Sequence, residues 1–446
     1  MSAPAPIPAA ALPVIVAIVL LNTAVWLTNG LFSPLAVATV ALALALFGHA
    51  LLIRGAVPET VFAGFAVVGV AVQGGLLLAC PPLNDVMFTS VVSAWPHYAA
   101  WSAVIVLAMS LAFVRLRFVP WVFLLLAVCV VLAGVWTIQT NVTPRVDVFY
   151  FQRDASTALL LGQNPYRLTF PNPYSPAESW VYAPGAAADG RLLFGFPYMP
   201  ATLLAVAPAQ WVLGDFRYAH LAWLVVPATL VVLALGTRTS ALAMALLLTA
   251  PRLPWVIEWG WTEPVLVGSL LLTALAAHRS SSLTALPLAL FLSAKQYMAL
   301  FAPLALLLPR RSTSKFLLLT FASGSLLTLP LVLWDFPAFW SSAVALQFRQ
   351  PFRPDALSLP ALVFHLTGHR LPELLSLVAA AGLALALTLL RRTPFPLALA
   401  LAVPVLFFLS KQAFANYYFL TAAIWCTTLA FPMRQKVPPT PPESLL

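Results

Sequence analysis

Long runs without charged side chains constrain this chain more than any other feature. Residues 14–26, 35–53, 99–114 and 118–138 contain no Lys, Arg, Asp or Glu. A helix needs about 20 mostly apolar residues to cross the hydrocarbon core of a bilayer. Charged residues make up 8% of the 446 residues, against roughly 25% in a soluble domain, which is too few to build a polar surface. The sequence therefore predicts an all-α fold, a polytopic transmembrane helical bundle.

The basic residues occur singly or in pairs between the apolar runs. This pattern is typical of the cytoplasmic turns of a membrane protein, so the net charge of +10 does not indicate nucleic-acid binding. Arg252, close to an outward turn, is the exception. If these basic turns are all cytoplasmic, this topology scheme predicts about 13 or 14 membrane crossings and places both termini in the cytoplasm. The absence of targeting signals suits a bacterial plasma membrane. The cytoplasmic turns are marked by Arg54, Arg115, Arg117, Arg238, His278, Arg279, Arg310, Arg311, Lys315, Arg391, Arg392, Arg434 and Lys436.

This scheme divides the chain into four parts. Residues 1–139 form a transmembrane block of about five helices. Residues 140–217 form a large outward-facing loop with an interfacial or re-entrant helix at 197–213, and the alternative is that this segment crosses the membrane fully. Residues 218–433 form a second transmembrane block with an outward loop at 334–371. Residues 434–446 are a Pro-rich tail, predicted to be disordered and cytoplasmic.

Asp147 stands just beyond the end of the fifth predicted helix, at the start of the large outward loop. A carboxylate that faces water beside a low-dielectric region can be tuned as a general base. The alternative is that it caps the next helix. For Asp154, farther along, a cap or a solvated charge is the better interpretation.

Three cations on the outward side could bind a phosphate. Lys295 lies inside an apolar stretch, where an ionisable residue suggests function, although it could instead extend from a helix end to the interface. Arg349 and Arg353 lie with Asp355 in an aromatic, Pro-rich loop. The planar guanidinium donates two hydrogen bonds at once to a phosphate, but an ordinary solvated loop remains the alternative.

Other polar residues near the outward turns have two interpretations. Glu263 could contact a sugar or an acceptor hydroxyl, or cap a helix before Pro264. Asp215 and Arg217 could simply pair with each other. Trp259 and Trp261 are expected as interfacial anchors, and we interpret the pair at 417–418 as interfacial tyrosines.

Nucleotide and metal chemistry have no sequence support. The chain has no phosphate-binding Gly-rich loop and no His/Cys cluster. We expect no cofactor and no metal site.

The motifs 145–148 (RVDV) and 162–166 (GQNPY) resemble the first luminal loop of GT-C superfamily glycosyltransferases, in the bacterial branch related to polyprenyl-phosphate-mannose-dependent mannosyltransferases. Segments 196–200 and 214–218 are similar to the family's segments after that loop, and Glu263 and segment 293–297 fall in family order. The resemblance covers about residues 140–430. One departure is that family members often have a single helix before this loop, whereas about five are predicted here.

The resemblance implies an inverting glycosyltransferase without a nucleotide cofactor. It would move a sugar, mannose or a related hexose or pentose, from a polyprenyl-phosphate donor to a glycan or glycolipid acceptor on the outer face, with Asp147 as the general base. The donor phosphate would be bound by Lys295, Arg349 and Arg353. The other expected substrate contacts are Arg145, Asn164, Tyr166, Glu263, Gln296 and Asp355.

Two other functions stay open. A transporter or lipid flippase would need charges midway along membrane helices and an inverted repeat; Lys295 is the one candidate for such a charge. A non-catalytic scaffold of an envelope-synthesis complex would need none of the outward polar residues.

Overall fold

The computed structural model describes residues 7–81, 83, 94–309 and 313–431. The predicted disordered tail and four of the cations used to assign the cytoplasmic turns (Arg310, Arg311, Arg434 and Lys436) lie outside the described residues. The structure is predominantly helical, as the apolar runs predicted.

Within the described ranges, five helices are long and apolar enough to cross a membrane, judged by length and composition. A 3-10 turn from Leu116 precedes one of them, α5. The five are α1 (Ala11–Thr28), α3 (Glu59–Leu78), α5 (Val119–Thr140), α8 (Arg217–Leu235) and α13 (Thr313–Trp334).

Shorter helices complete the bundle, and three of them, α9, α11 and α19, form its centre. Nearly every side chain of these three is buried, as expected of helices that are apolar on all sides. The shorter helices are α2 (Pro34–Ala50), α4 (Trp95–Ser110), α9 (Arg238–Leu248), α11 (Glu263–His278), α12 (Ala285–Ser293), α17 (Leu375–Leu390), α18 (Phe395–Phe408) and α19 (Ala415–Ala430).

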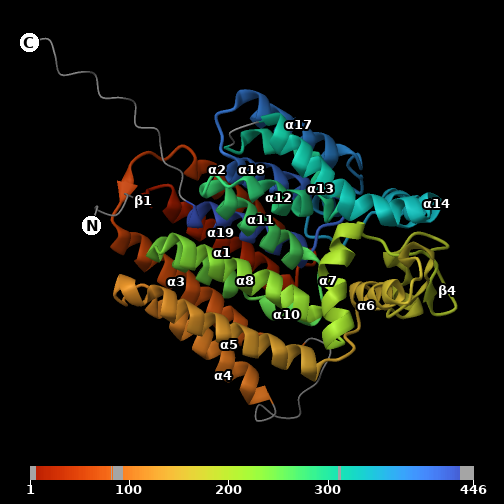
Figure 1. Ribbon diagram of the computed structural model, residues 1–446, viewed down its shortest axis with the longest axis horizontal. Helices are drawn as coiled ribbons and strands as arrows, with labels where there is room; N and C mark the ends of the chain where they lie inside the picture. Colours follow the sequence, from red (N-terminus) through yellow and green to blue (C-terminus); the bar gives the residue numbers. More distant parts are fainter. Residues whose placement is uncertain (1–6, 82, 84–93, 310–312, 432–446) are drawn as a thin grey trace, which may run out of the picture.

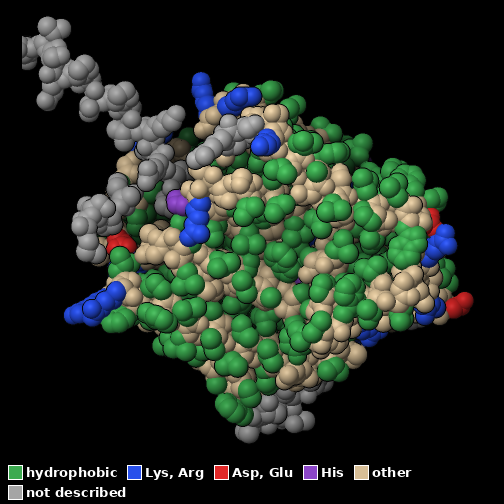
Figure 2. All heavy atoms as spheres, in the orientation of Figure 1, with side chains coloured by type: hydrophobic (Ala, Val, Ile, Leu, Met, Phe, Trp, Pro, Cys, Tyr) green, Lys and Arg blue, Asp and Glu red, His purple; other side chains and the backbone are tan. Residues whose placement is uncertain are grey.

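Several basic turns meet at one end of the bundle. Arg238 lies 3.7 Å from Glu59 and donates a hydrogen bond to the carbonyl of Val114, so the turns near residues 54, 115 and 238 lie together. A short antiparallel pair, β1 (Ile7–Pro8) with β2 (Ala56–Val57), lies at this end. Figure 2 shows the charged side chains mostly at the two ends of the molecule, with a broad apolar surface between them.

The opposite end carries the loop elements that the sequence placed on the outer side. Figure 1 shows α6, α14 and β4 together at this end, far from β1. The three short strands form one antiparallel sheet in the order β3-β5-β4. These elements are α6 (Asp147–Leu160), β3 (Phe170–Pro171), β4 (Ala187–Ala188), β5 (Arg191–Leu192), α7 (Pro200–Leu213), α10 (Leu253–Glu258), α14 (Phe336–Phe339), α15 (Leu346–Arg349) and α16 (Leu359–Thr367). A π-helical segment, Trp340–Ala345, joins α14 to α15.

Helix α7 is the segment for which an interfacial position was predicted. Pro200 occupies its first turn, and Gly214 ends it in the left-handed conformation with φ 76°. Its 14 residues extend about 21 Å, less than the roughly 30 Å of a hydrocarbon core. In Figure 1 α7 runs across the end of α8 rather than alongside it. The interfacial position itself stays a prediction.

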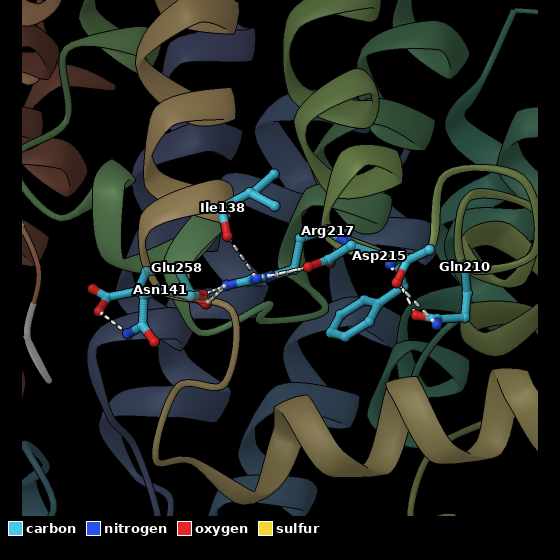
Figure 3. Close-up of polar contacts among 8 residues, drawn as sticks. Ile138, Asn141, Gln210, Asp215, Arg217 and Glu258 are labelled. Atoms are coloured by element: carbon cyan, nitrogen blue, oxygen red, sulfur yellow. Dashed lines mark hydrogen bonds and ion pairs between the residues drawn. The ribbon is translucent and has the colours of Figure 1, made fainter. Parts of the chain in front are cut away.

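A buried arginine joins the helix ends at this side (Figure 3). The Arg217 side chain has no exposed surface and pairs with Asp215, with Nη2 2.6 Å from Oδ2. Its Nη1 donates to the carbonyls of Asn141 and Glu258, each at 2.8 Å, and Nη2 donates to the carbonyl of Ile138 at 3.1 Å. The predicted local pair is confirmed, and the same guanidinium also holds the ends of α5 and α10 against the start of α8.

We expect Arg217→Lys to destabilise the protein by about 2–4 kcal/mol, because a lysine keeps the charge but cannot donate to Asp215 and three carbonyls at once. Thermal unfolding in detergent measures this change. The matched control is Arg191→Lys, at an exposed arginine bonded to Thr169, with an expected effect below about 0.5 kcal/mol. Equal unfolding temperatures for the two variants would show that the Arg217 guanidinium does not hold the helix ends together.

Candidate active site

A cavity of about 480 Å³ lies among the elements at the end opposite β1 and β2, which we call the outer end after the sequence-based expectation. Ligand cavities of small-molecule enzymes typically measure about 300–1,000 Å³. Its lining comes from several separate segments of the chain, so it exists only in the folded protein. The lining includes Asn29, Asp147, Tyr174, Tyr182, Tyr198, Trp255, Trp259, Trp261, Gln347, Gln350, Arg353, Gln412, Phe414, Asn416 and Tyr417.

Asp147 is the first residue of α6 and points its carboxyl group to hydroxyl and amide donors. The Tyr182 hydroxyl donates to Oδ2 at 2.5 Å, and the Tyr174 hydroxyl donates to Oδ1 at 3.3 Å. The backbone N–H of Val148 donates to Oδ1 at 2.8 Å. The carboxylate retains lone-pair capacity for a ligand, because each of its oxygens accepts about two hydrogen bonds.

Burial raises the pKa of Asp147 above its ordinary value. The hydrogen bonds from Tyr182, Val148 and Tyr174, and the more distant charge of Arg353, oppose this shift without cancelling it. A carboxylate with a raised pKa in a cavity has the properties of a general base.

Most other carboxylates at this end of the protein are paired with a cation. Asp355 accepts two hydrogen bonds from Arg353, both at 2.7 Å. Asp154 pairs with Arg153 at 2.7 Å, which agrees with its interpretation as a solvated charge rather than a catalytic group. Asp147 has no ion-pair partner within 4.0 Å among the described residues, so no adjacent cation neutralises the charge of its carboxylate.

Arg353 is the only cation among the described residues that line the cavity. Its guanidinium lies 4.8 Å from the ring centroids of both Trp180 and Phe414. The bonds to Asp355 use Nε and Nη2 and leave Nη1 for another acceptor. A positioned guanidinium of this kind can bind a phosphate oxygen.

Lys295 and Glu263 form a buried ion pair behind the cavity wall. Lys295 Nζ lies 2.5 Å from Glu263 Oε1, and Asn416 Nδ2 donates to the same oxygen at 2.9 Å. The ammonium is 5.5–5.6 Å from the rings of Tyr198, Tyr297 and Tyr417. With 5% of its side chain exposed, Lys295 does not extend to an interface, so that alternative is wrong. The pair reaches the cavity through Asn416, Tyr198 and Tyr417, which do line it.

Three predicted substrate contacts are hydrogen-bonded to other parts of the protein. Asn164 accepts from the backbone N–H of Tyr166, whose hydroxyl donates to the carbonyl of Tyr198 at 3.0 Å. Gln296 donates to the carbonyl of Pro197 at 2.8 Å and to that of Ala343 at 2.7 Å. These residues hold the 197–198 segment, which lines the cavity, in place.

Two of the predicted cations lie away from the cavity. Arg145 is exposed and pairs with Glu178 at 2.9 Å. Arg349 is exposed at the end of α15 and donates to the carbonyl of Ser341 at 3.4 Å. Among the sequence-predicted phosphate ligands, only Arg353 shares the cavity with Asp147.

Sequence reasoning missed several lining residues. Tyr174 and Tyr182 come after Asp147 at no regular spacing, so no motif connects them to it. The interpretation of residues 417–418 as interfacial tyrosines is wrong: Tyr417 lines the cavity, and Tyr418 is fully buried and donates to the carbonyl of Leu357. The position of Asn416 and Tyr417 beside an outward turn was the signal that could have identified them.

No protein-family model matches the chain, and no curated protein or solved structure matches it either. The functional argument therefore depends on the geometry of the cavity.

Replacing Tyr182 with Phe removes a hydrogen bond that favours the charged form of Asp147. We expect the pKa of Asp147, already raised by burial, to rise further, so that the carboxyl group stays protonated to higher pH. An infrared pH titration of the protonated carboxyl band, with Asp147→Asn subtracted, measures the midpoint. Tyr150→Phe, on the same helix, is the control and should leave it unchanged. A midpoint that falls in Tyr182→Phe would contradict the assigned hydrogen bond.

A double-mutant cycle tests the buried ion pair of Glu263 and Lys295. We expect Glu263→Gln alone, or Lys295→Met alone, to cost about 3–5 kcal/mol of unfolding free energy, because each leaves one buried charge unpaired. The double variant should be markedly more stable than the sum of the single changes predicts. Detergent-solubilised thermal unfolding of the four proteins gives the coupling, and additive losses would show that the two side chains do not pair.

Proposed function

We propose that this chain is a multi-pass membrane protein with a GT-C-type fold, and that it transfers a sugar from a polyprenyl-phosphate donor to an acceptor hydroxyl at the outer face. The observation that carries the proposal is the position of Asp147, held by two tyrosine hydroxyls in a cavity that also contains Arg353. The five long apolar helices support the membrane assignment.

The residues of the cavity supply the groups that the transfer requires. Asp147 accepts the proton of the acceptor hydroxyl as its oxygen forms a bond to the anomeric carbon of the donor sugar. The bond between that carbon and the phosphate oxygen breaks, and its electron pair leaves with the lipid phosphate. Attack opposite to the leaving group inverts the anomeric configuration. Arg353 stabilises the charge that develops on the departing phosphate.

An apolar groove beside the cavity suits the lipid part of the donor. It has a volume of about 700 Å³ and lies between α7, α8, α11, α12 and α13. Its wall is largely apolar, with Leu204, Leu275, Leu290 and Leu326 among the lining residues. Ala201, on the first turn of α7, lines this groove, whereas Pro197 and Tyr198, just before α7, line the cavity. Arg279 and Ser281 line the other end of the groove, so a polyprenyl chain that enters with its phosphate at the α7 end would place this phosphate near the cavity.

A transporter remains the second candidate, supported by the buried Lys295–Glu263 pair alone. Glu263 starts α11 and its partner Asn416 lies in the first turn of α19. The pair therefore lies at the outer end of the bundle and not midway along the helices, where transport sites are usually found. This position favours the transferase. Substrate uptake into vesicles that contain this protein alone would favour transport instead.

Replacing Asp147 with Asn should remove the general base while keeping the size of the side chain. We expect the turnover of sugar transfer from a polyprenyl-phosphate donor to fall about 10²–10⁴-fold. The measurement uses purified protein in nanodiscs, with radiolabelled donor and an extract of envelope glycolipids as the acceptor source.

Asp154→Asn is the matched control, because Asp154 lies on the same helix and pairs with Arg153. It should keep wild-type turnover. An Asp147→Asn protein that turns over at the wild-type rate would reject the assignment.

A further inference from the structure

Three tryptophans form one wall of the cavity. Trp255 and Trp259 are stacked, with ring centroids 5.3 Å apart and an interplanar angle of 27°. Trp261 meets Trp259 edge-on at 5.2 Å. All three line the cavity together with Asp147. We call these residues the tryptophan wall.

The turn that carries the wall is fixed by its packing. Gly260, between Trp259 and Trp261, has φ +65°, and a Cβ atom there would lie 2.6 Å from the ring of Phe216. Any larger residue would push the turn away from Phe216 and Arg217. The wall is therefore a rigid surface, which lowers the entropic cost of binding a ligand.

Only part of the wall can receive a ligand. The guanidinium of Arg252 lies 3.8 Å from the ring centroid of Trp255, and Trp259 stacks on the same residue. Trp255 is accordingly 2% exposed, whereas Trp259 is partly exposed. The accessible aromatic surface thus belongs mainly to Trp259. A cationic ligand is disfavoured because the charge of Arg252 already lies beside the stack.

Three polar atoms of lining residues lack hydrogen-bond partners in the described part of the chain. The Nε1 atoms of Trp255 and Trp259 and the Oε1 atom of Gln350 are buried, and each lacks a hydrogen-bond partner within the described part of the chain. Because these atoms have almost no accessible surface, a ligand in the cavity does not contact them, and the hydrogen-bonding surface of the cavity comes from the amides and tyrosines of its lining. Amide and tyrosine side chains present both donors and acceptors, which the hydroxyl groups of a ligand satisfy, since each hydroxyl both accepts and donates.

The charged side chains of the lining restrict the class of ligand further. Asp147 and Arg353 are the only charged side chains among the described lining residues, and the remaining polar ones are amides, tyrosines and the tryptophans. The amides belong to Asn29, Gln347, Gln350, Gln412 and Asn416. A ligand with apolar C–H faces, many hydroxyls and no net charge fits this lining, and a neutral pyranose has all three properties.

We propose that the tryptophan wall is a carbohydrate subsite that takes the terminal neutral pyranose of the acceptor. Its C–H face would stack on Trp259 while its hydroxyls bond amide and tyrosine groups of the lining, leaving one hydroxyl directed toward Asp147. The acceptor is then a glycan with a neutral sugar at its end, and not a protein side chain or an anionic headgroup. That the bound sugar is the acceptor rests on the proposed function, whereas sugar binding at the tryptophan wall does not.

Saturation-transfer NMR on the purified full chain in nanodiscs tests the subsite directly. The probes are the methyl glycosides of mannose, glucose and galactose, with glucuronate as an anionic comparison. We expect at least one neutral glycoside to receive saturation, strongest at its ring C–H protons, whereas any saturation of glucuronate, which Arg353 can bind, should survive Trp259→Ala. Trp259→Ala should weaken the binding of the neutral glycoside about tenfold or more, because the stacking surface is lost. Trp259→Phe, which keeps a smaller ring, should weaken it less, about threefold.

Trp121→Ala is the control, because Trp121 lies exposed on α5, outside the cavity lining, and it should leave binding unchanged. Absence of saturation with every neutral glycoside, or equal binding by wild type and Trp259→Ala, would overturn the subsite, whatever Asp147→Asn shows. If the glycosides bind at Trp259 but Asp147→Asn retains full turnover, the subsite stands and the transferase proposal fails.

Discussion

The buried guanidinium of Arg217 is the interaction on which the arrangement of the outer end depends. It donates hydrogen bonds to carbonyls at the ends of α5 and α10 while it pairs with Asp215 at the start of α8. The chain that leaves α5 leads to Asp147, and the chain that leaves α10 carries Trp259 and Trp261. One side chain thus sets the relative position of the two walls of the cavity, and Phe149 of α6 lies against the same guanidinium at 5.0 Å.

The pairing of charges explains why Asp147 differs from its neighbours. In a low-dielectric region an unpaired charge is costly, so buried ions are normally paired. Glu263 has Lys295, and Asp355 has Arg353. Asp147 has hydroxyl and amide donors instead, and burial raises its pKa. The same arrangement leaves Arg353 with one free nitrogen, so that a carboxyl group without an ion-pair partner and a partly satisfied guanidinium share one cavity.

Sequence patterns predicted the parts of this architecture that depend on local chemistry. Runs without charge indicated helices of membrane length, and the scattered basic residues indicated which turns share an end; Arg238, Glu59 and Val114 are indeed in contact. The loop that contains Asp147 was identified from its position after an apolar helix. Arg349 and Arg145 show the limit of this reasoning, because a polar residue in an outward loop can face solvent as easily as a cavity.

The amino-acid sequence by itself determined the helical class, the apolar surface and the concentration of polar residues on one side, because these properties depend on composition and on the spacing of apolar runs along the chain. Only the tertiary structure decided which polar residues meet. Tyr182 and Asp147, Lys295 and Glu263, and Trp259 and Gln350 are each brought near the cavity from separate segments. The physical reason is that the cavity is formed by packing between helix ends, and packing between distant segments leaves no periodic trace in the sequence.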